Sequence, residues 1–409
     1  MDSQPPRRPL WRRIVKWVLI SLAAVFLLVL ATLTIAVSYL SPERLTPIVT
    51  EQANKYLDAD VSIGRVELSF WSTFPRFEVD VRDLSVISRS LRRLPADVKA
   101  QLPAWADSLL NVKHFNAAIN IPELAIGRIS LYDIIIDSPR INLVSVNAES
   151  ANYNVVAPAP KAAAPTTEEP LSVPDFSFGK FEIIGNMPVR YLSVPDSTDI
   201  AVTLTTTRLQ GEAAPAYNLT VDGHSSARLG TIEIDNLRFG IGGKIKWNHK
   251  EPATFTLDDF KAGIGDVTTV TSAEIDMTDA LTIRTLDFEL PLTRLDAVTA
   301  LIPETMRGEL GKVTTDMSIA ATVRLTEPFS PGTDSIPSAT VTLKIPESSA
   351  SYDNLKLSRL ALEADAAIDG RNPDSSVLNI GNLVMIGEGV GFSLDARITT
   401  PLSDPAAEG

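Results

Sequence analysis

Apolar and polar residues alternate along most of this chain, in short runs separated by turn-forming residues. From residue 61 onward every second residue is apolar in one run after another. A period of two places the apolar side chains on one face of a strand and the polar side chains on the other. The clearest runs are Val79 and Val81; Ile119 and Ile121; Ile134 and Ile136; Ile232 and Ile234; Phe288 and Leu290; Val341, Leu343 and Ile345. The pattern predicts a mostly β protein whose sheet is antiparallel and apolar on one face.

Two of the runs change phase by one residue. The changes fall at Gly64-Arg65 and at Arg82-Asp83. An extra residue in one strand, a β-bulge, produces such a change and bends the strand. We therefore expect a bent sheet.

Helices are few in the predicted structure. Ser41-Pro42 is typical of a helix start, and apolar residues then recur at helical spacing to about Asp58. Residues 89–110 predict one or two short helices broken at Pro95 and Pro103, and 293–307 predict one more amphipathic helix. Residues 157–174 are rich in Pro and Ala without periodicity, which indicates a linker or long loop.

A basic cluster at residues 7–16 precedes an uncharged, apolar segment at 17–40. About 20 apolar residues cross a hydrocarbon core roughly 30 Å thick, so this segment predicts a transmembrane helix. A cleavable signal peptide is the alternative, but its apolar region usually covers only about 7–15 residues. The positive-inside rule then places residues 1–16 in the cytoplasm and exports the rest. The resulting division is 1–16 cytoplasmic, 17–40 membrane, 41–156 helix plus β-domain, 157–174 linker, and 175–409 a second β-domain.

The charge of the exported part argues against nucleic acid as a partner. The chain has a formal net charge of −13, and residues 1–16 carry five positive charges and one negative, so the remainder sums to −17. Such a surface repels phosphate backbones. There are no cysteines, so disulfides and thiol chemistry are excluded.

No group of residues predicts catalysis, a metal site or a cofactor. The three histidines, His114, His224 and His249, are far apart and have no carboxylate at metal-binding spacing. The glycine clusters at 240–243, 263–265 and 387–391 lack the strand-before, helix-after context of a phosphate loop and indicate turns or bulges. We therefore expect a protein that is not an enzyme.

Three segments resemble the AsmA family of bacterial envelope proteins, which includes TamB-like and YhdP-like members. Residues 45–86 contain a short helix, then the patterns I-x-x-V-x-L-S and F-P-x-F-x-V-x-V-x-x-L-S-V. Residues 109–144 end in P-x-I-x-L, and residues 290–312 resemble a helix-plus-proline element of the family. The likeness is good over the first 144 residues and loose beyond them.

The resemblance implies a long curved β-sheet with an apolar groove that moves phospholipid between the inner and outer membranes. It implies no catalytic residues. The groove lining that it implies here is Val79, Val81, Ile119, Ile121, Ile134, Ile136, Ile232, Ile234, Phe288 and Leu290. The predicted location is the bacterial inner membrane, with one span and most of the chain in the periplasm, and a partner protein in the periplasm or outer membrane.

An apolar sheet face must be covered by a second sheet, by helices or by lipid tails. With few helices, the choice lies between a lipid groove and tandem β-sandwiches whose faces seal against each other. Roughly twenty strands at about 4.8 Å each would give a groove on the order of 95 Å long. A second functional interpretation is a scaffold for outer-membrane protein assembly that binds partners by its sheet edges.

Overall fold

The computed structural model describes residues 41–69, 76–120, 129–147, 150–155, 176–213, 216–248, 253–278, 281–331, 336–353, 355–400 and 405–409. The predicted cytoplasmic segment 1–16, the predicted span 17–40, the predicted linker 157–174 and Ile121 lie outside these residues. Within the described ranges, the helices are all too short or too polar to cross a bilayer.

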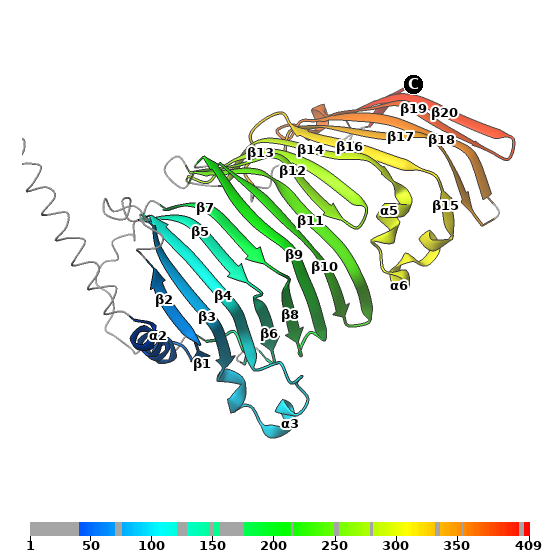
Figure 1. Ribbon diagram of the computed structural model, residues 1–409. Helices are drawn as coiled ribbons and strands as arrows, with labels where there is room; N and C mark the ends of the chain where they lie inside the picture. The colour runs from blue at the N-terminus through cyan, green and yellow to red at the C-terminus, as the bar shows by residue number, and fades with distance from the viewer. Residues whose placement is uncertain are drawn as a thin grey trace, which may run out of the picture.

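The described strands form one large sheet of 21 strands, which is curved and twisted (Figure 1). The prediction of a mostly β protein with few helices is confirmed, and the alternative of tandem β-sandwiches is wrong for these residues. The strands are β1 (Ala59–Ser62), β2 (Arg65–Ser69), β3 (Arg76–Ser88), β4 (Ser108–Asn120), β5 (Ile129–Asp137), β6 (Arg140–Ser145), β7 (Phe176–Ile184), β8 (Met187–Ser193), β9 (Thr198–Ala213), β10 (Ala216–Leu229), β11 (Ile232–Asn248), β12 (Thr254–Ile264), β13 (Val267–Asp276), β14 (Thr282–Arg294), β15 (Val313–Thr315), β16 (Ser318–Leu325), β17 (Ala339–Tyr352), β18 (Leu355–Ile368), β19 (Val377–Gly387), β20 (Val390–Thr399) and β21 (Ala406–Glu408).

Several short strands share one position in the sheet. Strands β1 and β2 both pair with β3, β5 and β6 both pair with β4, β7 and β8 both pair with β9, and β15 and β16 both pair with β17. From β9 to β14 and from β16 to β21, each strand lies beside the next in the chain. The roughly 17 positions, at about 4.8 Å each, span on the order of 75 Å, which is shorter than the sequence predicted.

The sheet is mostly antiparallel, as predicted, but it also contains parallel pairs. Strands β5 and β7 run parallel, and so do β6 and β8. Parallel neighbours require a crossover that returns the chain to its starting end. Residues 146–175 make this connection between β6 and β7, and they include the predicted linker. The alternation of apolar and polar residues does not show whether two strands pair in parallel or antiparallel.

A line of kinks crosses the first half of the sheet. The residue Asp83 in β3 has φ of 52°, Ser138 between β5 and β6 has φ of 50°, and Gly185 between β7 and β8 has φ of 78°. Adjacent kinks are tied together, since the Ser138 amide donates to the Ile184 carbonyl at 2.8 Å. Left-handed residues of this kind bend a strand and change its phase. The phase change predicted at Arg82-Asp83 coincides with the left-handed Asp83, but Arg82 and Leu84 pair with His114 and Val112 without an extra residue, so the β-bulge predicted there is wrong.

The helices follow the sequence with one difference. Helix α2 (Pro42–Tyr56) matches the prediction, and the 89–110 segment contains the short 3₁₀ helix η1 (Ser90–Arg93) and α3 (Ala96–Lys99). The single helix expected at 293–307 is two, α5 (Leu295–Ala300) and α6 (Glu304–Arg307), followed by η2 (Gly308–Lys312). Pro303 lies between them, and proline disfavours helical backbone at the residue before it and donates no amide hydrogen bond.

Helix α2 lies against the first edge of the sheet and satisfies backbone groups there. The Thr46 hydroxyl accepts from the Val66 amide at 2.8 Å. The Asn54 side chain accepts from the Val61 amide at 2.9 Å and donates to the Val61 carbonyl at 2.8 Å. An uncovered edge would offer these groups to another chain. The helix therefore closes this end of the sheet to strand addition.

Most fully buried apolar side chains lie at this same end. Ala59, Val61 and Val86 form one cluster, packed against Ala53 and Leu57. A second cluster packs Leu91, Ala106 and Val144 against Trp105 and Leu192 on the other face of the sheet. Both clusters lie beside strands β1 to β8, so the clustered apolar core of the described residues lies at the start of the sheet.

Candidate functional site

One face of the sheet carries an unbroken row of mostly apolar side chains from β3 to β13. Residues that lie directly opposite each other in paired strands point to the same face. In order across the sheet, one row is Val81, Phe115, Ile136, Ile183, Thr207, Val221, Ile241, Ala262 and Thr269. A second row beside it is Val79, Ala117, Ile134, Phe181, Leu209, Leu219 and Gly243. We call this face the apolar face.

The apolar face continues to the last strands. The Phe260 side chain of β12 lies on the same face as Ala262, and it starts a further row. That row is Phe260, Thr271, Phe288, Val323, Val341, Ala366, Leu378 and Ile398. The parallel row through Leu290 contains Ala321, Leu343, Ala364, Ile380 and Ala396. Apolar surface therefore extends along the whole sheet.

All described members of the sequence-predicted set lie on this one face. Val79, Val81, Ile134 and Ile136 are in the first rows, and Ile119 has the same parity as Ala117 in β4. Ile232 and Ile234 pair with Leu229 and Ala227 of β10. Both β10 residues are an even number of positions from Val221, so they lie on the same face as Val221. Phe288 and Leu290 are in the rows toward the C-terminus. The tenth member, Ile121, lies outside the described residues.

The sequence prediction omitted several members of the rows. Phe115 and Ala117 lie in β4, and Phe181, Ile183 and Leu209 lie in the next strands. The alternation of residues 108–120 is interrupted by Lys113 and His114 close to the line of kinks, which obscured the phase. The alternation of Phe181 and Ile183 with Lys180 and Glu182 could have placed both residues on the apolar face.

The opposite face carries polar residues in an equally continuous row, and we call it the polar face. This row is Asp80, Asn116, Ile135, Glu182, Arg208, Thr220, Gly242, Lys261, Val270, Glu289, Thr322, Thr342, Asp365, Asn379 and Arg397. Ion pairs link neighbouring strands on it, such as Arg208 Nε to Glu182 Oε1 at 3.0 Å and Arg324 Nε to Asp287 Oδ2 at 2.9 Å. Exposed pairs add little stability, but they mark this face as the solvated one.

Beyond the N-terminal clusters, the apolar face is only partly covered. The predicted residues on it are half-buried, and Trp247 and Ile264 are 47% and 48% exposed. Trp247 lies opposite Phe255, and Ile264 lies opposite Phe239, so both belong to the apolar face. Soluble proteins seldom leave a continuous apolar surface of this extent uncovered without a binding role. The face is the candidate functional site.

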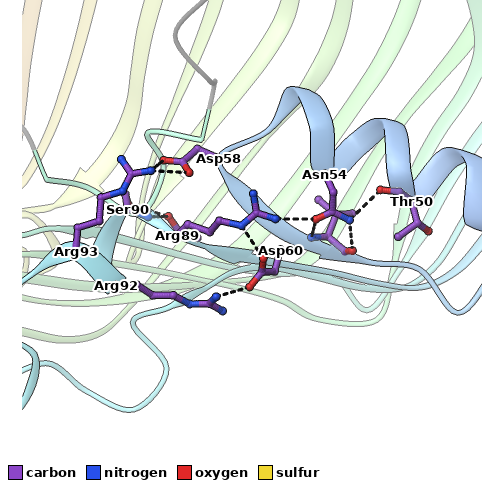
Figure 2. A network of polar contacts seen from close by, with 10 residues as sticks. Thr50, Asn54, Asp58, Asp60, Arg89, Ser90, Arg92 and Arg93 are labelled. Carbon is purple, nitrogen blue, oxygen red and sulfur yellow. Dashed lines mark hydrogen bonds and ion pairs between the residues drawn. The ribbon is translucent and has the colours of Figure 1, made fainter.

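A network of charges fixes α2 to the start of the sheet (Figure 2). Arg89 Nε donates to Asp60 Oδ1 at 2.6 Å, and its Nη2 donates to Asn54 Oδ1 at 3.2 Å. Arg92 pairs with the other oxygen of Asp60 at 2.5 Å, and Arg93 Nη2 donates to Asp58 at 3.0 Å. These contacts hold the strand β1, the helix that caps it and the η1 segment together.

The hydrogen bond from Arg89, aided by Arg92, lowers the pKa of Asp60 despite the opposing effect of desolvation. A depressed folded-state pKa stabilises the fold above the unfolded value of about 3.9, and this stabilisation is lost as the pH falls through the folded value. We expect Asp60→Asn to lower the thermal unfolding midpoint at neutral pH, with a difference from wild type that shrinks below about pH 4. The control is Asp235→Asn at an exposed site in β11. A difference between wild type and Asp60→Asn that is constant with pH would contradict the assignment.

Among the described residues, no three His, Asp or Glu side chains lie close enough together to hold a metal ion. His114 contacts Asp80, which also pairs with Arg82 at 2.9 Å, and this group lies on the polar face. His224 lies in β10, and His249 is outside the described residues. The chemistry that the described site supports is apolar binding.

Comparison of the chain with protein-family models, with curated proteins and with solved structures found no match.

Proposed function

We propose that this protein is an AsmA-like, inner-membrane-anchored periplasmic protein that binds phospholipid on the apolar face and conducts it between the inner and outer membranes. It thereby supports the homeostasis of the outer membrane. Residues 17–40 are the proposed single span, with the N-terminus in the cytoplasm. The proposed action is not enzymatic, because movement along a continuous apolar path needs no covalent step.

The observation that carries the proposal is the continuity of the apolar rows from β3 to β20. Each buried CH₂ group of an acyl chain gains about 0.8 kcal/mol, so two long chains on this face would be bound strongly. Because similar rows follow one another along the sheet, a lipid can move from one strand position to the next without leaving apolar contact. The polar face opposite, with its ion pairs, keeps the sheet soluble.

A second candidate function is a non-enzymatic scaffold for outer-membrane protein assembly. It is favoured by the last edge of the sheet. Within the described residues, β21 covers only Arg397 to Thr399 of β20, whereas α2 caps the first edge. An uncovered edge strand can pair with an extended segment of another protein. A scaffold would bind protein at β20 and would carry no lipid on the apolar face.

Three adjacent isoleucines in β5 provide the test. Ile134 and Ile136 lie on the apolar face, and Ile135 between them lies on the polar face. A photoreactive amino acid is placed at each position in the full-length protein in cells, and crosslinked phospholipid is measured after irradiation. We expect lipid adducts at positions 134 and 136 and none at 135. Equal labelling at all three positions, or none at any, would contradict lipid binding on the apolar face.

A further inference from the structure

The apolar face contains a hollow at strands β15 and β17 to β20. A cavity of about 530 Å³ lies between residues of β15, β17, β18, β19 and β20. Its apolar lining comprises Val313, Ala350, Tyr352, Leu355, Leu357, Met385, Val390 and Phe392. Pockets for small ligands have volumes of roughly 300–1,000 Å³ and are lined mainly by apolar groups.

The cavity is continuous with the apolar face. Phe392 pairs with Met385, and Met385 pairs with Leu360. Leu360 is two residues from Leu362 in β18, so the two side chains lie on the same face. Leu362 lies opposite Ile345, two residues after Leu343 in the rows described above. Bulges in β17, β18 and β19 change the phase of these strands together, so the face stays the same. A hydrocarbon chain on the central face can thus extend into the cavity without crossing a polar surface.

The side chains at this hollow are exposed to an unusual degree for their size. Leu355 is 65% exposed, Val390 is 73% exposed and Phe392 is 51% exposed. They lie close to two hairpin turns, one between β17 and β18 and one between β19 and β20. The two turns are neighbours, because Leu357 of β18 lies opposite Gly387 of β19, which in turn lies opposite Val390 of β20. Gly387 is closely packed here, because a Cβ at this position would lie 2.5 Å from the Lys356 carbonyl oxygen. Covering these three side chains with hydrocarbon would remove a large apolar area from water.

One wall of the cavity is fixed by a strap of chain outside the main strand order. Val313 of β15 pairs with Tyr352 of β17. The Tyr352 hydroxyl donates to Glu309 Oε2 in η2, and Lys312 Nζ donates to Glu309 Oε1 at 2.9 Å. The bond to Glu309 raises the pKa of the Tyr352 phenol, which in any case is protonated at neutral pH and can donate this hydrogen bond. The wall is therefore preformed.

We infer that this cavity is a binding site for the end of a fatty acyl chain of a lipid that lies on the apolar face. The inference rests on the proposed function and adds a specific location to it. The occupant is argued from the apolar lining, the volume and the continuity with the face. The polar groups in the lining, Ser351, Lys356 and Glu388, do not form a set that would select a polar ligand there.

The test maps where the tail of a lipid lies. Full-length protein is reconstituted into phosphatidylcholine vesicles that contain a phosphatidylcholine with a diazirine at the end of one acyl chain. After irradiation, crosslinked peptides are identified by mass spectrometry. We expect adducts on Tyr352, Leu357, Met385 or Phe392. Leu355→Asp and Phe392→Asp should each reduce them by about tenfold or more, because a carboxylate is poorly tolerated against hydrocarbon.

Controls separate this inference from the proposed function. Leu292→Asp changes an apolar residue that is 61% exposed but lies outside the cavity, and it should leave the adducts unchanged. Val313→Phe fills the cavity without adding charge and should also reduce the adducts. Adducts confined to strands β3 to β14 would overturn the binding of an acyl chain in the cavity and leave the proposed function intact. Absence of adducts from the whole apolar face would overturn both.

Discussion

We expect Ile134→Asp combined with Ile234→Asp to remove bound phospholipid from the full-length protein. Both side chains lie on the apolar face, in β5 and in β11. An ionised carboxylate that faces hydrocarbon without a partner costs several kcal/mol. Because about 1.4 kcal/mol is a tenfold change in binding, two such groups should reduce bound lipid by about a hundredfold or more. The measurement is phospholipid per protein after purification, by lipid extraction and native mass spectrometry.

The matched control places the same charge on the polar face of the same strand. Ile135 lies between Asn116 and Glu182 in the polar row, so Ile135→Asp adds a carboxylate among polar groups. It should leave the bound phospholipid within about twofold of wild type, since surface substitutions are usually worth less than about 0.5 kcal/mol. Equal loss from Ile135→Asp and from the double variant would show a loss of folding rather than of binding.

The two faces could be predicted from the sequence because a strand has a period of two whatever its neighbours. This is why Ile134 and Ile234, a hundred residues apart, could be placed on one face. The same logic located the kink at Asp83, where the alternation changes phase. The left-handed φ of 52° there is the local cause of a pattern already visible in the sequence.

The neighbours of each strand could not be predicted, because they depend on pairing between distant segments. The parallel pairs β5–β7 and β6–β8 follow from the return of the chain through residues 146–175. The capping of β1 by Asn54 was also missed, since a polar residue in an amphipathic helix is ordinarily read as part of its solvated face. In both cases the outcome depends on hydrogen bonds to backbone groups that are distant in the sequence.

Asn152 is the clearest example of such a role, and its replacement should have the largest effect on stability. It is fully buried at 0% exposure. It lies in the segment that connects β6 to β7, where the sequence gives no periodic signal. Its Oδ1 accepts from the Val144 amide at 2.8 Å, and its Nδ2 donates to the carbonyls of Ala106 and Asn142 at 2.9 Å and 2.8 Å. One side chain thus completes the backbone bonding of β6 where β4 no longer runs beside it.

We expect Asn152→Ala to lower the free energy of unfolding by about 3 kcal/mol or more, because three buried backbone groups lose their partners at once. The measurement is urea unfolding of wild type and variant, followed by tryptophan fluorescence, since Trp105 packs in the adjoining cluster. Asn152→Asp should also be much less stable than wild type, because a carboxylate can accept from the Val144 amide but cannot donate to the two carbonyls. The control Asn147→Ala, at an exposed position in the same connection, should change stability far less. If Asn152→Ala unfolds at the same urea concentration as Asn147→Ala, then the connection does not hold β6 in place and the start of the sheet is stabilised by its apolar clusters alone.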